Sequence, residues 1–510
     1  MGPSGGPITK DQTGVETYAV IFTIAPSYHE PGTIWVGSDD GLVHVTRDGG
    51  ATWTNVTPPG TPEFARISLI EASPHQPGKA YVAAKRYRLD DRAPYIFKTT
   101  DYGRTWTKIV NGIRDIDFVH AVREDPKREG LLYAGTEHGV YVSFDDGASW
   151  QSLNLDLPDV SVHDLWVEEN DLVIATHGRS FYVLDDIWPL RQLTPQVARA
   201  DVHLYRPAPA IRSVDQGVVV QYHLKQPAKE LKIEFLDANG QSIRSFAYEA
   251  RDSARGGQGQ GGGRFGGGQT RVSNKAGLNR VVWDMRYPGA KDFPGMILWA
   301  AGTRGPRAAP GKYQVRLVAD GRTLTEPFEI RKDPRLTTVT QADLEEQFRF
   351  AMQIRDKTSE ANEAVLLIRG VKSQIDDRIG KANDRRITSA GEALKAALTE
   401  VEGEIYQYRN RSSQDPLNYP IKLNNKIAAL LNIVDGADAR PTDQSYTVFE
   451  ELSARLAEQI ARMNQLLDRE LPRFNELLGG KGLEPVRREP LATEGRPVAD
   501  DDEETEVKFW

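Results

Sequence analysis

Short apolar runs separated by polar turns fill the first part of the chain. An apolar run at 18–24 is followed by a Pro/Gly turn at 26–32 and a second apolar run at 34–36. The same order, continued by a polar loop and a third run, returns three more times before residue 190. Four strands in about 45–50 residues is the period of a β-propeller blade. The pattern therefore predicts about four blades in residues 1–195, as part of a larger propeller.

Three polar octets mark the ends of these units. Thr46–Trp53, Thr99–Trp106 and Ser143–Trp150 all read (S/T)-x-D-x-G-x-(S/T)-W, and a degenerate fourth copy ends at Trp188. In a hairpin turn the aspartate accepts backbone N–H groups, the glycine supplies a positive φ and the tryptophan packs beneath the turn. We therefore expect structural roles for nine positions: Asp48, Gly50, Trp53, Asp101, Gly103, Trp106, Asp145, Gly147 and Trp150.

The octets resemble the Asp-box, or BNR, repeat of sialidases, sortilin-type receptor domains and endoglucanase propellers. The longer stretches GTIWVGSDDGLVHVTRDGGATW and ATHGRSFYVLDDIWPLRQL are similar to bacterial proteins labelled BNR-repeat glycosyl hydrolase or sortilin-like. The resemblance implies that the octets lie away from any active site and that the protein is extracytoplasmic, either periplasmic or secreted. Because such propellers have six or more blades, it also implies a C-terminal portion that is completed by a missing propeller half or by another copy.

The loops between the second and third strands lie at the opposite end of each blade from the octets. They carry carboxylates, histidines and arginines, which make a candidate ligand face: Asp39, Asp40, Arg86, Glu137, His138, His177 and Arg179. Paired carboxylates could perform glycosidic acid/base chemistry, and arginines could hold a carboxylated sugar. The alternative is that these loops are simply exposed and polar.

No catalytic residue can be named from the sequence. A sialidase needs an arginine triad, a tyrosine nucleophile and a carboxylate partner, and that set cannot be placed on this chain. We therefore expect a scaffold for glycan or protein recognition without catalysis of its own, or alternatively a sialidase- or endoglucanase-like glycoside hydrolase acting through the same face. No cofactor or metal site is expected, since no tight ligand cluster occurs.

Composition excludes several kinds of site and partner. The chain has 510 residues, a net charge of -8 and no cysteine, which excludes disulfides and thiolate sites and argues against nucleic acid as a partner. The N-terminus has no basic segment followed by an apolar one, so no signal peptide is predicted. No apolar run is long enough to span a membrane.

Two further domains are predicted. Alternating strands and turns such as Asn239-Gly240 indicate an immunoglobulin-like β-sandwich over 196–333, with a glycine-rich loop at 256–268. A switch to helical periodicity predicts a bundle of three long helices and one short one over 334–480, opened by a capping box at Thr340 and Asp343. The polar stretch 481–510 is expected to be a disordered tail.

Overall fold

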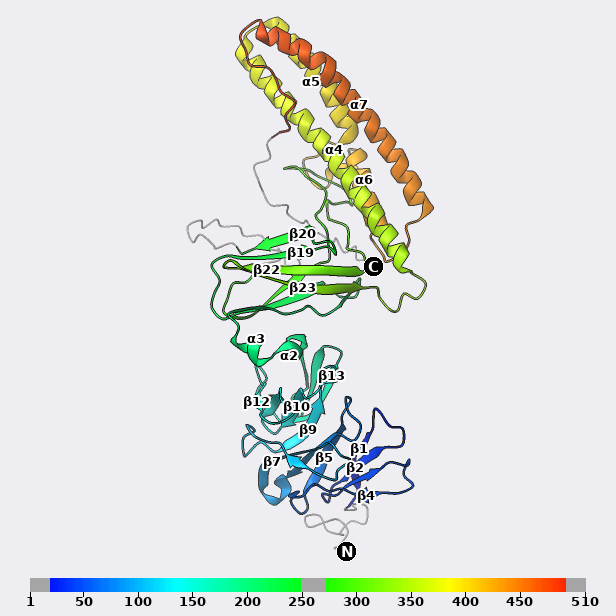
Figure 1. Ribbon diagram of the computed structural model, residues 1–510. Helices are drawn as coiled ribbons and strands as arrows, with labels where there is room; N and C mark the ends of the chain where they lie inside the picture. The colour runs from blue at the N-terminus through cyan, green and yellow to red at the C-terminus, as the bar shows by residue number, and fades with distance from the viewer. Residues whose placement is uncertain (1–18, 216, 249–271, 492–510) are drawn as a thin grey trace. The chain divides into compact units, whose positions relative to one another are not determined.

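The computed structural model describes residues 19–215, 217–248 and 272–491. The chain divides into two compact units, Met1–Arg199 and Ala200–Trp510, each with its own core (Figure 1). The predicted glycine-rich loop at 256–268 and the end of the predicted tail, 492–510, lie outside the described residues. A mainly antiparallel β fold followed by a helical region confirms the predicted fold class in outline.

The first unit consists of four antiparallel sheets, each formed by consecutive strands. The sheets are β1 (Ile21–Pro26), β2 (Ile34–Ser38), β3 (Val43–Thr46) and β4 (Thr54–Asn55); β5 (Arg66–Ala72), β6 (Ala80–Arg86), β7 (Asp91–Thr99) and β8 (Thr107–Lys108); β9 (Val119–Glu124), β10 (Leu132–Thr136), β11 (Gly139–Ser143) and β12 (Gln151–Ser152); and β13 (Val162–Glu168), β14 (Asp171–Thr176) and β15 (Phe181–Leu184). A short 3-10 helix, η1 (Tyr87–Leu89), precedes β7, and α2 (Trp188–Gln192) and α3 (Pro195–Arg199) close the unit. The fourth sheet has three strands.

The sheets pack as propeller blades. Their first strands contact one another in series, β1 with β5, β5 with β9 and β9 with β13. A separate apolar core fills each of the three junctions between successive blades. The junction of the third and fourth blades, for example, buries Val140 and Val142 against Val162 and Leu165. The blades are therefore held face to face by burial of apolar side chains, which is the dominant favourable term in folding.

Each first strand carries a β-bulge at the same place. The register shifts by one residue between Ile21 and Thr23 in the first blade and at the matching positions of the other three blades. The extra residues are Phe22, Ser68, His120 and His163. Because a bulge re-aims a side chain without ending the sheet, these four positions are directed differently from their neighbours.

The three octets fold into the same network of hydrogen bonds. In the first, Asp48 accepts the backbone N–H of Thr52 (2.9 Å) and its hydroxyl (2.7 Å), while Thr46 Oγ1 accepts the N–H of Gly50 (2.9 Å). The octets centred on Asp101 and Asp145 repeat these bonds. This agrees with the structural role expected for the aspartates and glycines.

The octet tryptophans do more than pack beneath their own turns. Trp106 Nε1 donates to the carbonyl of Val56 and Trp150 Nε1 to that of Ile109, each at 2.8 Å and each in the preceding blade. Trp53, in the first blade, is 44% exposed. It differs from Trp106 and Trp150 because the carbonyl that each of those two indoles bonds to is supplied by a preceding blade.

The second unit begins with a two-sheet sandwich. One sheet has the order β16 (Val202–Leu204), β18 (Val218–Leu224), β21 (Gly277–Trp283), and the other β17 (Ala210–Ile211), β23 (Arg322–Arg331), β22 (Gly311–Ala319), β19 (Leu231–Leu236), β20 (Ser242–Ala247). The pair β17–β23 is parallel and the others are antiparallel. The core joins both sheets, with Phe235 stacked on Trp283 at 4.8 Å.

Helices complete this unit. They are α4 (Gln341–Ala382), α5 (Arg385–Ile405), α6 (Leu423–Val434) and α7 (Asp443–Gly479), with the 3-10 helix η2 (Asp415–Leu417) before α6. Thr340 and Asp343 form the expected capping box at the start of α4. One apolar core runs through all four helices.

The segment after α7 packs against the helices as far as residue 491, whereas the whole of 481–510 was predicted to be a disordered tail. Val486 is buried in the helical core and its N–H donates to Asn475 Oδ1 (2.8 Å), while Leu491 N donates to Leu366 O (2.9 Å). Gly370 makes room for this segment, since a Cβ there would lie 2.2 Å from Glu489 O. The segment was predicted to be disordered because its composition is polar. It is nevertheless held by the apolar side chain of Val486 and by backbone hydrogen bonds, which do not depend on the type of side chain.

Candidate functional site

Six polar side chains from three blades meet at the end of the blades opposite the octets. They are Lys85 at the end of β6, His120 on β9, Glu137 in the β10–β11 turn, Ser161 just before β13, His163 on β13 and His177 in the β14–β15 turn. We call these six residues the imidazole cluster. Two of its histidines, His120 and His163, are bulge residues of neighbouring first strands, and the bulges bring their rings together.

The rings form a continuous stack. His120 lies 4.2 Å from His163, and His163 lies 4.7 Å from His177, ring centre to ring centre. His120 also contacts Phe118, whose ring centre is 5.1 Å away and whose plane is tilted by 56°, and Phe118 in turn lies parallel to Tyr87 at 4.7 Å. His120 and Phe118 are buried, whereas His163, His177 and Tyr87 are exposed. The stack therefore runs from solvent through a buried centre and back to solvent.

Hydrogen bonds order the charged groups around the buried ring. Lys85 Nζ lies 2.7 Å from His120 Nδ1, and His120 Nε2 lies 3.2 Å from Glu137 Oε2 and 3.1 Å from Ser161 Oγ. Ser161 Oγ also donates to Glu137 Oε2 (2.8 Å). A protonated Lys85 can only donate to Nδ1, so the ring proton of neutral His120 is on Nε2 and points to Glu137 and Ser161.

Burial and mutual repulsion keep the cluster low in positive charge. Burial lowers the pKa of His120 to about 2, and Lys85, His163 and His177 add to the shift. Burial, followed by repulsion from Arg66 and Arg88, lowers the pKa of Lys85 to about 8. Burial and Lys85 also lower the pKa of His163. At neutral pH the buried histidine is thus an uncharged donor held between an ammonium and a carboxylate.

Two of the residues predicted for the ligand face, Glu137 and His177, belong to this cluster. The other five lie outside the cluster, where they bond to nearby loops or face solvent. Asp39 accepts the N–H groups of Ala19 and Val20 (3.0 and 3.1 Å), and Asp40 accepts the hydroxyl of Ser38. Arg86 donates to Glu63 O (2.8 Å), His138 Nδ1 lies 2.8 Å from Asp159 Oδ1, and Arg179 is exposed.

Sequence reasoning missed Lys85, His120, Ser161 and His163. A signal was present, because the dipeptide Val-His occurs at 119–120 and at 162–163, at the same position of two successive first strands. A polar aromatic residue at one position of adjacent repeats indicates side chains that meet near the propeller axis. These histidines were not predicted as site residues because they lie in strands, whereas the predicted ligand face consists of loop residues.

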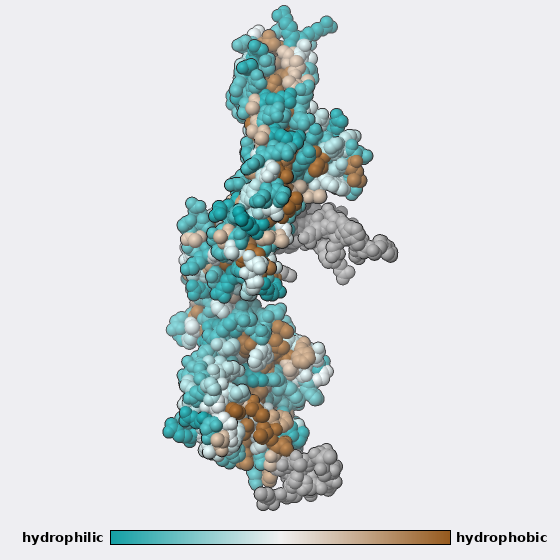
Figure 2. Space-filling model, turned by 90° about the vertical axis from the view of Figure 1, so that its right-hand side faces the viewer, coloured by the Kyte–Doolittle hydropathy of each residue, from teal (hydrophilic) through white to brown (hydrophobic). Residues whose placement is uncertain are grey.

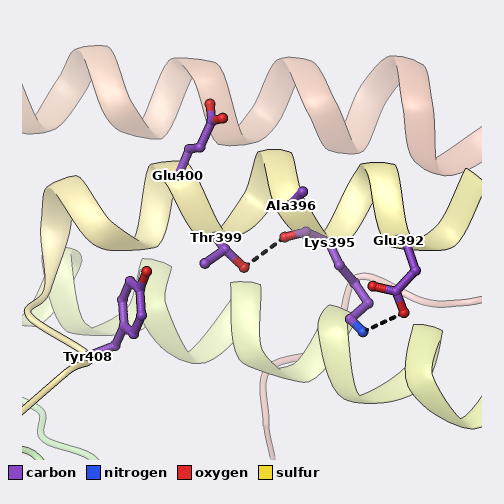
Figure 3. A pocket seen from close by; sticks show the side chains of 6 residues that line it. All are labelled: Glu392, Lys395, Ala396, Thr399, Glu400 and Tyr408. Atoms are coloured by element: carbon purple, nitrogen blue, oxygen red, sulfur yellow. Dashed lines mark hydrogen bonds and ion pairs between the residues drawn. The ribbon is translucent and has the colours of Figure 1, made fainter.

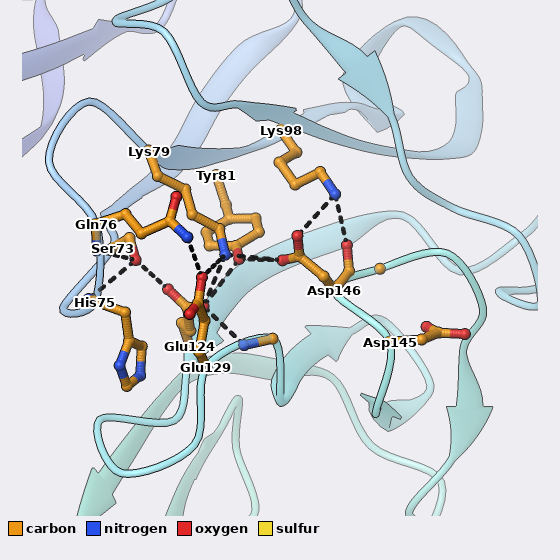
Figure 4. A network of polar contacts seen from close by, with 12 residues as sticks. Ser73, His75, Gln76, Lys79, Tyr81, Lys98, Glu124, Glu129, Asp145 and Asp146 are labelled. Atoms are coloured by element: carbon orange, nitrogen blue, oxygen red, sulfur yellow. Dashed lines mark hydrogen bonds and ion pairs between the residues drawn. The ribbon is translucent and has the colours of Figure 1, made fainter. Parts of the chain in front are cut away.

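A second polar network lies at the octet end of the second and third blades (Figure 4). The buried Lys79 lies 3.2 Å from Glu124, 3.3 Å from Glu129 and 3.2 Å from Asp146. Burial alone would lower the pKa of Lys79, but the carboxylates of Glu124 and Asp146 raise it overall. Lys98 and Tyr81 also bond to Asp146. Here each charge has a partner, so the network joins two blades and leaves no group free for a ligand.

A shallow depression on α5 is a weaker candidate (Figure 3). It has a volume of about 410 Å³ and is lined by Glu392, Lys395, Ala396, Thr399, Glu400 and Tyr408. Lys395 pairs with Glu392 at 3.0 Å and also with Asp376, and Thr399 bonds to the backbone of its own helix. These are ordinary contacts of a helix surface.

Neither a metal centre nor a membrane span is found in the part of the chain that the structure describes. Among residues 19–215, 217–248 and 272–491, no three His, Asp or Glu side chains gather as metal ligands would. Within the same ranges, the helices lack an apolar stretch of the length needed to cross a bilayer.

No family model matches the chain. A probable oligoxyloglucan-reducing end-specific xyloglucanase of Neosartorya fischeri is 25% identical over 164 residues, which is 29% of this chain and 18% of that protein. The oligoxyloglucan-reducing end-specific xyloglucanase of Emericella nidulans is 25% identical over 130 residues, or 24% and 15% of the two chains. The match therefore spans less than a fifth of the length of either relative.

Three solved structures are similar at low TM-score. YCF48 from Cyanidioschyzon merolae has a TM-score of 0.26 and 18% identity, covering 42% of this chain and 66% of its own. An ancestral GH74 enzyme has a TM-score of 0.28 and 17% identity, covering 59% and 46%. PorZ of Porphyromonas gingivalis has a TM-score of 0.19 and 12% identity, covering 60% and 51%. The proteins similar to this chain thus include xyloglucanases and, at low TM-score, a GH74 enzyme.

Proposed function

We propose that the propeller blades form a sortilin-like, Asp-box scaffold that recognises a glycan or a peptide or protein ligand at the imidazole cluster, without catalysis of its own. The observation that carries the proposal is the meeting of six polar side chains from three blades around a ring stack whose two ends are exposed. Exposed rings next to fixed donors and acceptors suit both sugar faces and peptide side chains. The immunoglobulin-like sandwich and the bundle are accessory modules in this proposal, which places the protein outside the cytoplasm.

The carboxylate content of the cluster supports recognition over hydrolysis. Glycoside hydrolysis uses two carboxyl groups about 5–9.5 Å apart, one of them as an acid. Glu137 is the carboxylate of the cluster, and it already accepts hydrogen bonds from Ser161 and His120. The imidazole beside it, that of His120, is neutral and therefore a poor general acid.

The test is a binding screen of the full chain against glycan and peptide arrays. The variant His163→Ala/His177→Ala removes two exposed rings of the cluster and should weaken binding of any array ligand at least tenfold. His138→Ala is the matched control, because His138 is a histidine on the same loops whose partner is Asp159 rather than the cluster. Equal binding by wild type and the double variant would reject the site.

A glycoside hydrolase is the second candidate, favoured by the similarity to two xyloglucanases. The assay is release of reducing sugar from xyloglucan oligosaccharides, β-glucans and sialosides by the wild type and by Glu137→Gln. Turnover by the wild type that is lost in Glu137→Gln would establish this function in place of pure recognition. Turnover that survives Glu137→Gln would place the chemistry elsewhere.

A further inference from the structure

One face of the first blade has the same pattern of apolar residues as the faces that pack against a preceding blade. Its β1 carries Ile24, whose counterparts in the register of the other first strands are Ile70, Val122 and Leu165. Those three are buried against the preceding blade, whereas Ile24 is 63% exposed. The same contrast holds three residues earlier, where Ile21 is 60% exposed and Ile67, Val119 and Val162 are fully buried.

The octet of the first blade shows the same opening. A Cβ on Gly103 would lie 2.6 Å from Val56 of the preceding blade, and one on Gly147 would lie 2.4 Å from Ile109. Gly50, at the same octet position, would meet only its own Trp53. Trp106 and Trp150 donate to the preceding blade, whereas Trp53 is 44% exposed, so the first octet has the shape of an interblade contact on which no blade packs among the described residues.

The last blade presents the complementary face. Phe181 and Val183 on β15 correspond in register to Val140 and Val142 on β11. Val140 and Val142 are buried against the following blade, whereas Phe181 is 74% exposed and Val183 is 51% exposed. Figure 2 views the molecule from the side on which β1 and β2 lie in Figure 1. It shows apolar side chains, in brown, gathered on that side of the propeller unit. Apolar patches of this kind mark interaction surfaces.

We propose that these two faces bind a second copy of this chain, the β1 face of one copy packing on the β15 face of the other. The three internal junctions all join one such face to the other, so the chain carries both halves of an interface that it already makes three times. Applied twice about a two-fold axis, the contact closes a ring of eight blades. Eight lies within the range of 4–8 blades typical of propellers, and a two-fold dimer is the commonest closed assembly.

The test is the mass of the full 510-residue chain in solution, measured by light scattering after size exclusion at about 1–50 μM. The proposal expects about twice the chain mass of 56.8 kDa. Ile24→Glu and Phe181→Glu each place a carboxylate in the interface and should raise the dissociation constant by about 100-fold or more. Both positions are exposed in the single chain, so circular dichroism should show both variants folded. Ile433→Glu, at a 71% exposed apolar position on α6, is the control and should stay dimeric.

Mixing the two variants distinguishes this contact from any other self-association. Ile24→Glu retains a working β15 face and Phe181→Glu retains a working β1 face, so each alone should be monomeric and a 1:1 mixture should form a dimer through a single contact. A monomeric wild type at 50 μM, a dimer unaffected by either substitution, or a mixture that remains monomeric would each overturn the proposal.

Discussion

The indole of Trp150 donates a hydrogen bond to the carbonyl of Ile109 at 2.8 Å, so the octet of the third blade is fastened to the second. The carbonyl lies in the preceding blade, and both residues are buried in the core of that junction. The octet is therefore a joint between blades as well as a turn within one.

Replacing this indole should be costly only where a preceding blade exists. Trp150→Phe removes the bond and leaves a buried carbonyl without its donor, which we expect to lower the free energy of unfolding by about 2–4 kcal/mol. Trp53→Phe, at the 44% exposed counterpart, should change it by less than about 1 kcal/mol in the monomeric Phe181→Glu background. Urea denaturation of the two variants measures both values, and equal losses would contradict the role of the joint.

The octet aspartates should make the blades sensitive to acid. Hydrogen bonds from the side chain and backbone of Thr52 lower the pKa of Asp48 to about 2, and those from Thr105 do the same for Asp101. Because the folded-state pKa is below the ordinary value of 3.8, this stabilisation is complete above pH 4 and is lost as the pH falls towards 2.

The measurement is thermal unfolding followed by circular dichroism between pH 5 and pH 2. Asp101→Asn keeps the shape of the octet but removes one titrating group, so its melting temperature should be lower than that of the wild type at pH 5 and should approach it at pH 2. A constant difference across this range would show that the carboxylate charge contributes nothing.

Lys85 should make the stability depend on pH in the alkaline range. Its folded-state pKa of about 8 is below the ordinary 10.5, so between these values the unfolded chain binds a proton that the folded chain does not. The contribution of Lys85 to stability therefore rises with pH from about 8 to 10.5. This rise should be absent in Lys85→Met. The increase in the free energy of unfolding between pH 7.5 and pH 10 should therefore be smaller in Lys85→Met than in the wild type by about 1–3 kcal/mol. Urea titrations at the two pH values measure it.

A buried arginine joins the sandwich to the helices within the second unit. Arg212 Nη2 donates to Gln347 Oε1 of α4 (2.9 Å), Nη1 bonds to Asp438, and Nε donates to Ala308 O (2.9 Å). Breaking this set leaves the buried Asp438 carboxylate with Arg307, 4.0 Å away, as its cation, so Arg212→Met should destabilise the unit by about 3–5 kcal/mol. Arg331→Met, which removes an exposed pair with Glu329, should cost less than about 1 kcal/mol. Both are measured by urea denaturation.

Much of the local structure was predictable because it depends on neighbours in the sequence. The octets needed only the spacing of Asp, Gly and Ser/Thr, since their hydrogen bonds close within seven residues. The start of α4 followed from Thr340 and Asp343 for the same reason. Val486 bonds to Asn475 of α7, and Leu491 bonds to Leu366 of α4, 125 residues earlier in the chain, so the packing of this segment depends on the tertiary structure.

Two of the six residues of the candidate site were predicted. Glu137 and His177 could be identified because turn residues of a repeat can be located from its period. His120 and His163 could not, because their directions depend on a β-bulge, and a bulge is a property of the pairing between two strands. Lys85 contacts His120 of the next blade, and its burial lowers its pKa.

By itself the sequence determined the repeat, the octet turns, the order of sandwich and helices, and the absence of cysteine chemistry. Only the tertiary structure decided that His120 and His163 stack across two blades, that the octet tryptophans bond to the blade before them, and that β1 and β15 present open faces. The reason is physical. Turns and helix caps are satisfied by atoms a few residues away, whereas burial, side-chain direction and pKa depend on which distant segments arrive alongside.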